Sequence, residues 1–243
     1  MRLLALWITI TMFPTSAQAA MMRIDRPSDQ LYIVGKIVAG DYDQFVDVIK
    51  RSNDDILAVN IVSPGGSTIE AIKIGQLIRR LYLATNAPSL ANFAPEARRM
   101  ICSIAASIDR STSCSCASAC FLIWSAGVER SGNDIHIHRI AFDADYYGSL
   151  PPNVASQKYQ EALQVVHSYL REMEIPDSIY EEMVSMPSYT TALLQQANWA
   201  WPPSFAEWLT ARCGPPTRRD SMCELQQRTA ATRQALREYR SHP

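Results

Sequence analysis

The sequence predicts a single α/β domain of stacked strand–turn–helix units, and three observations lead to this class. An apolar stretch at 56–62 is typical of a strand buried on both faces of a parallel sheet. It runs into a Gly-Gly turn at 65–66, after which isoleucine and leucine recur at helical spacing up to residue 81. A chain of 243 residues with 47% hydrophobic content is long enough to bury a complete core. Strands and helices that alternate in this way pack as layers.

The remaining segments extend the alternation along the chain. Their apolar periodicity predicts two further strands, at 31–38 and 135–140, and further helices at 43–51, 121–124, 153–173 and, in part, 179–194. Residues 86–115 break the pattern with prolines, small residues and cysteines, and we expect them to form an insert. Residues 210–243 form a C-terminal extension, whose Arg-rich polar tail is expected to be a helix at the surface.

The N-terminus has the pattern of a secretory signal peptide. Arg2 is followed by an apolar run at 3–13, and small residues then lead to the cleavage motif Ala17-Gln18-Ala19. The run is too short to span a bilayer, and no later segment is long and apolar enough to do so. We therefore expect residues 1–19 to be removed and the mature chain to be exported into a bacterial periplasm. Retention of the run as an uncleaved anchor is the alternative.

The net charge limits the partners that the protein can bind, and the cysteine content bears on its disulfides. The net charge of -1 gives no electrostatic case for binding nucleic acid or an anionic membrane. In an exported protein the six cysteines are expected to form disulfides. Cys213 and Cys223 bracket a Gly-Pro-Pro turn that can bring them together, so we predict a bridge between them. The spacing leaves open the pairing of the other four, which are Cys102, Cys114, Cys116 and Cys120.

Three short motifs bring candidate chemistry into this framework. The turn Ser63-Pro64-Gly65-Gly66 opens a helix, where free backbone amides and the positive end of the helix dipole suit a developing oxyanion. Ser118 stands at the start of a buried helix and is a candidate nucleophile. The strand at 135–140 carries His138, a candidate general base. Each motif alone is common, and their order along the chain is what makes them specific.

This order of motifs resembles the Clp protease proteolytic subunit and its exported relatives, in the ClpP/crotonase superfamily. The resemblance rests on the Gly-Gly turn after an apolar strand, on Ala117-Ser118-Ala119-Cys120 with the run that follows to Gly127, and on Ile135-His136-Ile137-His138. It covers about residues 31–201 and implies a ClpP/crotonase-like domain over 20–209.

The resemblance implies a role for each matching residue. Ser118 would be the nucleophile, and a neutral His138 would take its hydroxyl proton during attack and return it to the leaving amine. The backbone amides of Gly66, or of the adjacent Gly65, and of Ala119 would hold the tetrahedral oxyanion. The implied substrate is a peptide or an unfolded protein, and the implied assembly is a homo-oligomer that associates through the long helix.

We expect the activity to be independent of ATP and of any cofactor. The phosphate-binding motif G-x-x-x-x-G-K-[ST] is not present in the sequence. An exported protein would also not meet a cytosolic unfoldase. The function expected from the sequence is therefore that of an exported, ATP-independent serine peptidase.

The chain departs from the family at the third catalytic residue. The orienting aspartate of the family should fall within 186–191, where there is no carboxylate, and Asp177, Asp143 and Asp145 do not match its position. Without that acid the imidazole is oriented and stabilised less well, so we expect slow turnover. We expect the far nitrogen of His138 to meet a neutral group, such as a hydroxyl or a backbone carbonyl.

Three alternatives stay open. A Ser118–Lys158 dyad, as in signal-peptide-peptidase relatives of the same fold, would need a desolvated lysine as its base. A binding or scaffold protein would keep a groove for peptides after the catalytic geometry had decayed. His136 shares a strand face with His138, and we expect it to satisfy a buried hydrogen bond. A metal site, which oxidising export disfavours, would draw on Cys114, Cys116, Cys120, His136 and His138.

Overall fold

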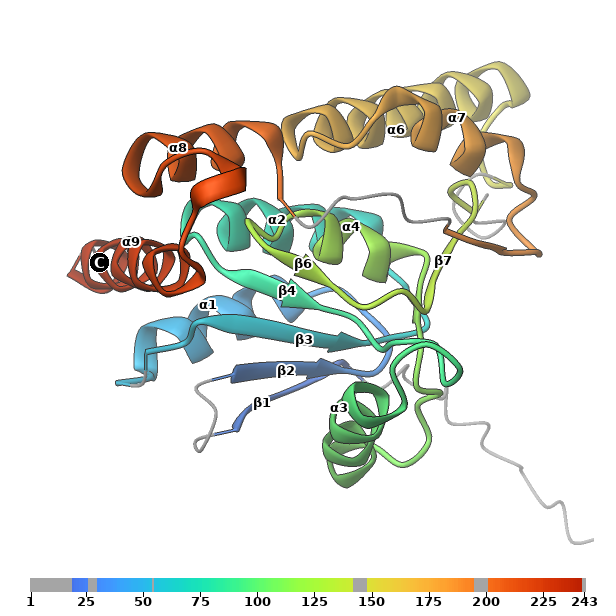
Figure 1. Ribbon diagram of the computed structural model, residues 1–243. Coiled ribbons are helices and arrows are strands. Elements are labelled where there is room, and N and C mark those ends of the chain that lie inside the picture. Colours follow the sequence, from blue (N-terminus) through green and yellow to red (C-terminus); the bar gives the residue numbers. More distant parts are fainter. Residues whose placement is uncertain (1–18, 26–29, 54, 142–147, 195–200, 242–243) are drawn as a thin grey trace, which may run out of the picture.

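A five-stranded sheet in the order β1-β2-β3-β4-β6 crosses the centre of the molecule (Figure 1). The computed structural model describes residues 19–25, 30–53, 55–141, 148–194 and 201–241. Neighbouring strands run parallel, except that β1 runs antiparallel to β2. The strands are β1 (Met21–Asp25), β2 (Gln30–Val34), β3 (Ala58–Val62), β4 (Ala84–Asn86) and β6 (Arg130–Ser131).

A smaller sheet in the order β5-β7-β8 continues from the end of β3 through a bridge between Ser63 and Cys116. Its strands are β5 (Cys116–Ala117), β7 (Ile135–Ile137) and β8 (Ala192–Leu193). The helices are α1 (Asp41–Arg51), α2 (Thr68–Arg80), α3 (Pro95–Ile108), α4 (Ala119–Ser125), α6 (Pro152–Glu172), α7 (Asp177–Ser185), α8 (Pro203–Cys213), the short η1 (Pro216–Arg218) and α9 (Ser221–Ser241). The predicted α/β class of stacked strand–turn–helix units is thereby confirmed.

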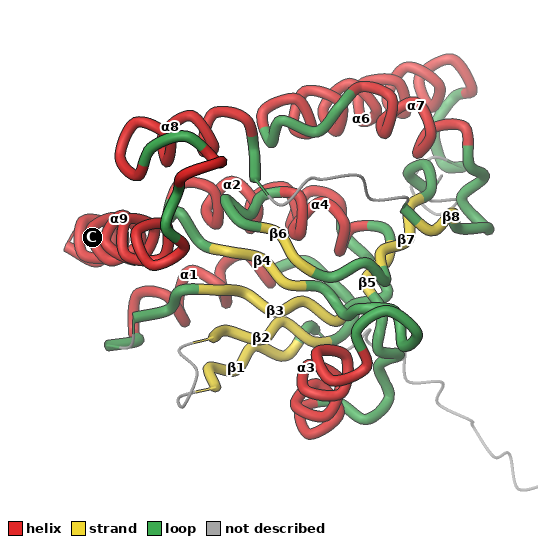
Figure 2. Tube along the Cα trace, viewed as in Figure 1, coloured by secondary structure: helices red, strands yellow, loops and turns green. Residues whose placement is uncertain are grey.

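Helices cover both faces of the central sheet, because its strands are apolar on both sides (Figure 2). In β2, Leu31 and Ile33 belong to the main core with α1, α2 and α4, whereas Tyr32 and Val34 pack with residues of α3. All five residues of β3 are buried, as expected of a parallel strand covered on both faces. The helices α6 and α7 form an outer layer over α2 and α4 (Figure 1).

The outer layer holds α4, the helix that begins next to Ser118. Tyr169 of α6 is buried, and its hydroxyl donates to the Leu122 carbonyl of α4 at 2.7 Å. Arg79 of α2 donates from Nε to the carbonyl of Ala126, just beyond the end of α4, at 2.8 Å. These contacts fix α4 against two neighbouring helices along its length.

Several elements differ from the sequence predictions. The antiparallel strand β1 was not predicted. The insert contains a helix, α3, which covers one face of the sheet. The helix predicted in part over 179–194 ends at Ser185, and β8 follows it. The polar tail is a helix, as expected, but α9 also contributes to the core, since Thr232 and Leu236 are buried.

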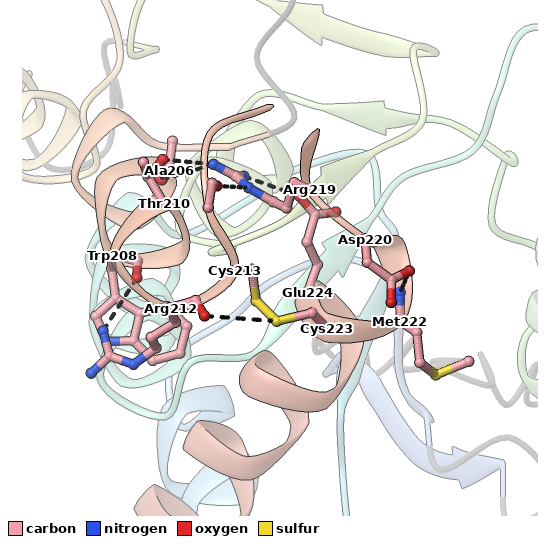
Figure 3. The surroundings of a disulfide bond; sticks show 11 residues. Ala206, Trp208, Thr210, Arg212, Cys213, Arg219, Asp220, Met222, Cys223 and Glu224 are labelled. Atoms are coloured by element: carbon pink, nitrogen blue, oxygen red, sulfur yellow. Dashed lines mark hydrogen bonds and ion pairs between the residues drawn. A yellow bond between two sulfur atoms is a disulfide. The ribbon is translucent and has the colours of Figure 1, made fainter. Parts of the chain in front are cut away.

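The bridge between Cys213 and Cys223, predicted from the turn between them, joins α8 to α9 (Figure 3). Beside it, the Arg212 guanidinium lies 4.0 Å from the ring centre of Trp208. The expected signal peptide falls, up to residue 18, outside the described residues. Among the helices that are described, none is both long and apolar enough to cross a bilayer.

Candidate active site

Ser118 occupies a sharp turn between β5 and α4. Its backbone has φ 57° and ψ −121°, a combination that non-glycine residues rarely adopt. Its N–H donates to the His136 carbonyl of β7 at 2.9 Å, and its carbonyl accepts from Phe121 at 2.9 Å. Such strained backbone is found where a fold has to aim a functional side chain. A strand-to-helix turn of this kind presents a serine hydroxyl at the edge of a sheet.

A disulfide between Cys116 and Cys120 spans this turn. Cys116 is the first residue of β5 and Cys120 belongs to the first turn of α4, and both are completely buried. The bridge therefore closes a small ring that contains Ser118. It ties the strand that leads into the turn to the helix that leaves it.

The Gly-Gly turn packs directly on Ser118. Ser63, which precedes the turn, accepts from the Ala117 amide at 2.9 Å. A Cβ added at Gly65 would lie 2.6 Å from the Cβ of Ser118, closer than two carbon atoms can approach. Glycine at position 65 is thus required for the turn to approach Ser118 this closely. The sequence motifs at 63–66 and 117–120, predicted to cooperate, are brought together in space.

The backbone amides of the Gly-Gly turn and of Ala119 are the predicted donors of an oxyanion hole. The Gly65 amide already donates to the Ser63 hydroxyl at 3.0 Å, so of the two glycines Gly66 is the better candidate. Among the described residues, the Gly66 amide donates to no backbone carbonyl. The Ala119 amide also lies at the N-terminus of α4, where the helix leaves such groups unpaired.

His138 follows β7, and its ring orientation is fixed by the backbone. Its Nδ1 lies 2.7 Å from the Arg139 carbonyl, and because a carbonyl only accepts, Nδ1 carries the proton. The Nε2 lone pair is then the one that can act as a base. No hydrogen bond joins the Ser118 hydroxyl to His138 among the described residues, so their direct contact stays a prediction.

The segment expected to hold the third catalytic residue lies next to His138. The Arg139 amide donates to the Met186 carbonyl at 3.2 Å, which places the start of 186–191 beside the strand. The partner of His138 Nδ1 is the neutral Arg139 carbonyl, and which ring nitrogen faces Ser118 stays a prediction. Asp177 pairs instead with His167, at 2.9 Å. Asp143 and Asp145 lie outside the described residues.

His136 belongs to a separate polar network that the sequence did not predict. Its Nε2 lies 2.9 Å from Oδ1 of Asp134, whose other oxygen accepts from Arg98 of α3. Arg98 also donates to the carbonyls of Ser89 and Cys114, at 2.8 and 3.0 Å. This network ties the insert to β7, and it agrees with the structural role expected for His136. Arg98 lies 36 residues before Asp134 in the sequence, so no local pattern predicts their contact.

Lys158 has the surroundings of a solvated helix charge. Its side chain is 48% exposed, and its Nζ lies 2.9 Å from Oε2 of Glu161, one turn along α6. A lysine acts as a base only where burial or neighbouring charge favours its neutral form. The observed surroundings therefore favour His138 over Lys158 as the base.

All six cysteines are paired, which resolves the question that the spacing left open. The bridges are Cys102–Cys114, Cys116–Cys120 and Cys213–Cys223. The disulfides remove the thiolates that the alternative metal site would have used. Among the described residues, no three or more histidine, cysteine or acidic side chains form a cluster suited to a metal ion.

Comparison with known proteins gives a distant structural likeness. No protein-family model matches the chain, and no curated protein matches it. Among solved structures, the chain is similar to a mutant of the membrane-bound stomatin-specific protease 1510-N. The TM-score is 0.40 at 16% identity, and the match covers 76% of this chain and 83% of that chain.

Proposed function

We propose that this protein is an exported, ATP-independent serine peptidase of the Clp protease type, with Ser118 as nucleophile and His138 as general base. The observation that carries the proposal is the packing of the Gly-Gly turn on Ser118. A serine in a strained turn lies against Gly65, and an added Cβ at Gly65 would also lie 3.1 Å from the Ala119 nitrogen. A nucleophile next to unpaired amides is the arrangement that acyl transfer requires.

The proposed reaction follows from these groups. The Ser118 hydroxyl attacks the scissile carbonyl while Nε2 of His138 takes its proton. The amides of Gly66 and Ala119 stabilise the oxyanion, and each such donor typically lowers the barrier by about 3 kcal/mol. His138 then gives the proton to the leaving amine, and water hydrolyses the acyl-enzyme. The neutral Arg139 carbonyl fixes the tautomer but stabilises the imidazolium less than a carboxylate does, so turnover should be slow.

Labelling with a fluorophosphonate tests the assignment of the nucleophile. Wild-type protein should form one covalent adduct, located on Ser118 by mass spectrometry of its peptides. The variant Ser118→Ala should lose both the adduct and the hydrolysis of unstructured peptides, while its circular dichroism and melting temperature remain close to those of wild type. Ser113→Ala, at an exposed serine five residues away, is the matched control and should label normally. Full peptidase activity in pure Ser118→Ala protein would contradict the proposal.

A peptide-binding protein without hydrolysis is the second candidate function. The observation in its favour is that His138 has a carbonyl rather than a carboxylate as its partner. This candidate predicts that peptides bind, as measured by fluorescence anisotropy, while no adduct forms on Ser118 at any pH. The labelling experiment therefore separates the two functions.

A further inference from the structure

Ala20, the first residue after the predicted cleavage site, is buried beside a buried carboxylate. Ala19 is exposed, whereas Ala20 is 1% exposed and belongs to the main core. The backbone nitrogen of Ala20 lies 3.4 Å from Oδ2 of Asp41, which is also 1% exposed. Gly35 packs nearby, since a Cβ added there would lie 3.6 Å from the Cα of Ala20, an ordinary van der Waals distance. The predicted cleavage bond thus joins an exposed residue, Ala19, to a buried residue, Ala20.

Removal of the leader changes the chemistry of this nitrogen. A signal peptidase hydrolyses the bond between Ala19 and Ala20 with one water molecule, which leaves a carboxylate on Ala19 and an α-ammonium group on Ala20. The peptide amide offers Asp41 one hydrogen and no net charge, whereas the ammonium offers three hydrogens and a positive charge. Because Ala20 is buried in the folded protein, cleavage has to precede folding of this region.

We propose that the α-ammonium group of Ala20 forms a buried ion pair with Asp41 in the mature protein, and that this pair orders the loop that supports the Gly-Gly turn. Oδ2 of Asp41 also accepts from the Val38 amide at 2.8 Å, so the carboxylate already holds this loop. The neighbouring Ile37 accepts from the Ser67 amide at 2.8 Å and donates to the Gly65 carbonyl at 2.9 Å. The new terminus is therefore connected to the turn through Asp41, which holds Val38, and through the adjacent Ile37, which bonds to the turn.

The groups around Asp41 disfavour its charged form, so a cation beside the carboxylate would stabilise it. Burial raises the pKa of Asp41 in the uncleaved chain and negative Glu70 raises it further, although the Val38 and Ala20 amides oppose both effects. Glu70 itself pairs with Lys73, at 3.2 Å. Of the side chains that the structure describes, no lysine, arginine or histidine forms an ion pair with Asp41.

The ion pair is tested with two chains that differ by one residue. One begins at Ala20 and the other at Ala19, and because Ala19 is exposed its presence adds no steric conflict. At pH 7 the chain that begins at Ala20 should melt about 5 °C or more above the other, as expected when a buried carboxylate gains its partner. The variant Asp41→Asn should abolish this difference. Equal melting temperatures, or a difference that survives Asp41→Asn, would overturn the proposal.

The pH dependence of the same difference provides an independent test. The uncleaved form loses stability as pH rises through the raised pKa of Asp41, because the carboxylate then ionises without a cationic partner. The advantage of the mature chain should therefore grow through this range. The advantage should disappear again when the α-ammonium group deprotonates. Because pairing with Asp41 raises the pKa of this group, the loss is expected above the ordinary value of about 7.7–8.0. If Asp41→Asn does not fold, an NMR titration showing an α-amino pKa at or below the ordinary range would still reject the ion pair.

The link to the turn is measured without catalysis, in a Ser118→Ala background. Hydrogen exchange at the amides of Ile37 and Ser67 should be slower in the chain that begins at Ala20. Exchange that is the same in both chains would show that the pair stabilises the terminus alone and would overturn the coupling to the turn. The coupling matters for catalysis only if the proposed function is correct. The melting temperature and the hydrogen exchange, however, do not depend on whether Ser118 is a nucleophile.

Discussion

At the scale of single residues, the candidate site depends on two unusual backbone conformations that meet. Ser118 is a non-glycine residue with positive φ, and Gly65 has φ 101° at the point where the turn touches it. The Ser118 conformation costs energy that surrounding contacts have to offset, whereas glycine adopts positive φ without a steric penalty. The strain at this contact therefore lies at Ser118, and Gly65 permits the close approach.

Gly65→Ala tests whether this close approach matters. The added methyl group would overlap the Ser118 Cβ, so we expect fluorophosphonate labelling to fall at least tenfold and stability to fall by about 2 kcal/mol or more. Gly40→Ala is the matched control, since Gly40 also has positive φ, at 93°, but has no neighbour within 4 Å of an added Cβ. It should cost only about 1–2 kcal/mol through backbone strain and leave labelling unchanged. Equal effects of both substitutions on labelling would argue against a specific role for Gly65.

His138→Gln tests the identity of the base. Loss of proton transfer should slow labelling and hydrolysis about 100-fold or more, because general base catalysis typically contributes that much. Lys158→Gln serves as the control and should leave the rate unchanged. The opposite pattern, with Lys158→Gln inactive, would establish the Ser118–Lys158 dyad.

At the scale of secondary-structure elements, the Cys116–Cys120 disulfide is the main device that shapes the turn. Replacing both cysteines by alanine removes the link between β5 and α4, so the Ser118 backbone can relax. We expect labelling of Ser118 to fall at least tenfold, even where circular dichroism shows the fold to be retained. Replacing Cys213 and Cys223, which join α8 to α9 far along the chain, is the control and should reduce melting temperature without reducing labelling below saturation. Normal labelling without the Cys116–Cys120 bridge would contradict this role.

The elements that the sequence predicted are those whose pattern is local. The strand at 58–62 and the helix at 68–80 carry continuous or periodic apolar residues, and the Gly-Gly turn between them is legible in the sequence. The strand β1 has no such pattern, because only pairing with β2 makes it a strand. The helix α3 was obscured by the prolines and cysteines around it. Which cysteines pair is decided by distances in the folded chain, and spacing does not contain that information.

The residues of the candidate site also fall into those that a local sequence pattern predicts and those that it does not. Ser118, Gly66 and His138 were found from motif order, since each lies in a short run with its own signal. The network of Arg98, Asp134 and His136 was not found, because Arg98 comes from the insert and meets β7 only in three dimensions. The proposed ion pair of Ala20 could not be predicted either, since its geometry depends on the packing of Asp41.

At the scale of the whole molecule, the C-terminal helix ties distant parts of the fold together. Figure 1 places α9 at one end of the domain, near α1. Thr232 donates to the Tyr82 carbonyl at 2.8 Å, and Arg240 donates to the Ile49 carbonyl at 2.9 Å, so α9 holds the ends of α2 and α1. The extension therefore stabilises the domain at the end opposite the candidate site.

Leu236→Ala measures this contribution. Leu236 is 1% exposed within the main core, so its truncation leaves a cavity and should cost about 2–4 kcal/mol. For a chain of this size, that corresponds to a fall in melting temperature of roughly 5–15 °C. Leu225→Ala, in the same helix but 47% exposed, is the control and should change stability by about 0.5 kcal/mol or less. Because the candidate site lies at the other end of the molecule, the labelling rate of Ser118 in folded Leu236→Ala protein should equal that of wild type. A strong loss of labelling below the melting transition would show instead that α9 affects the geometry of the site.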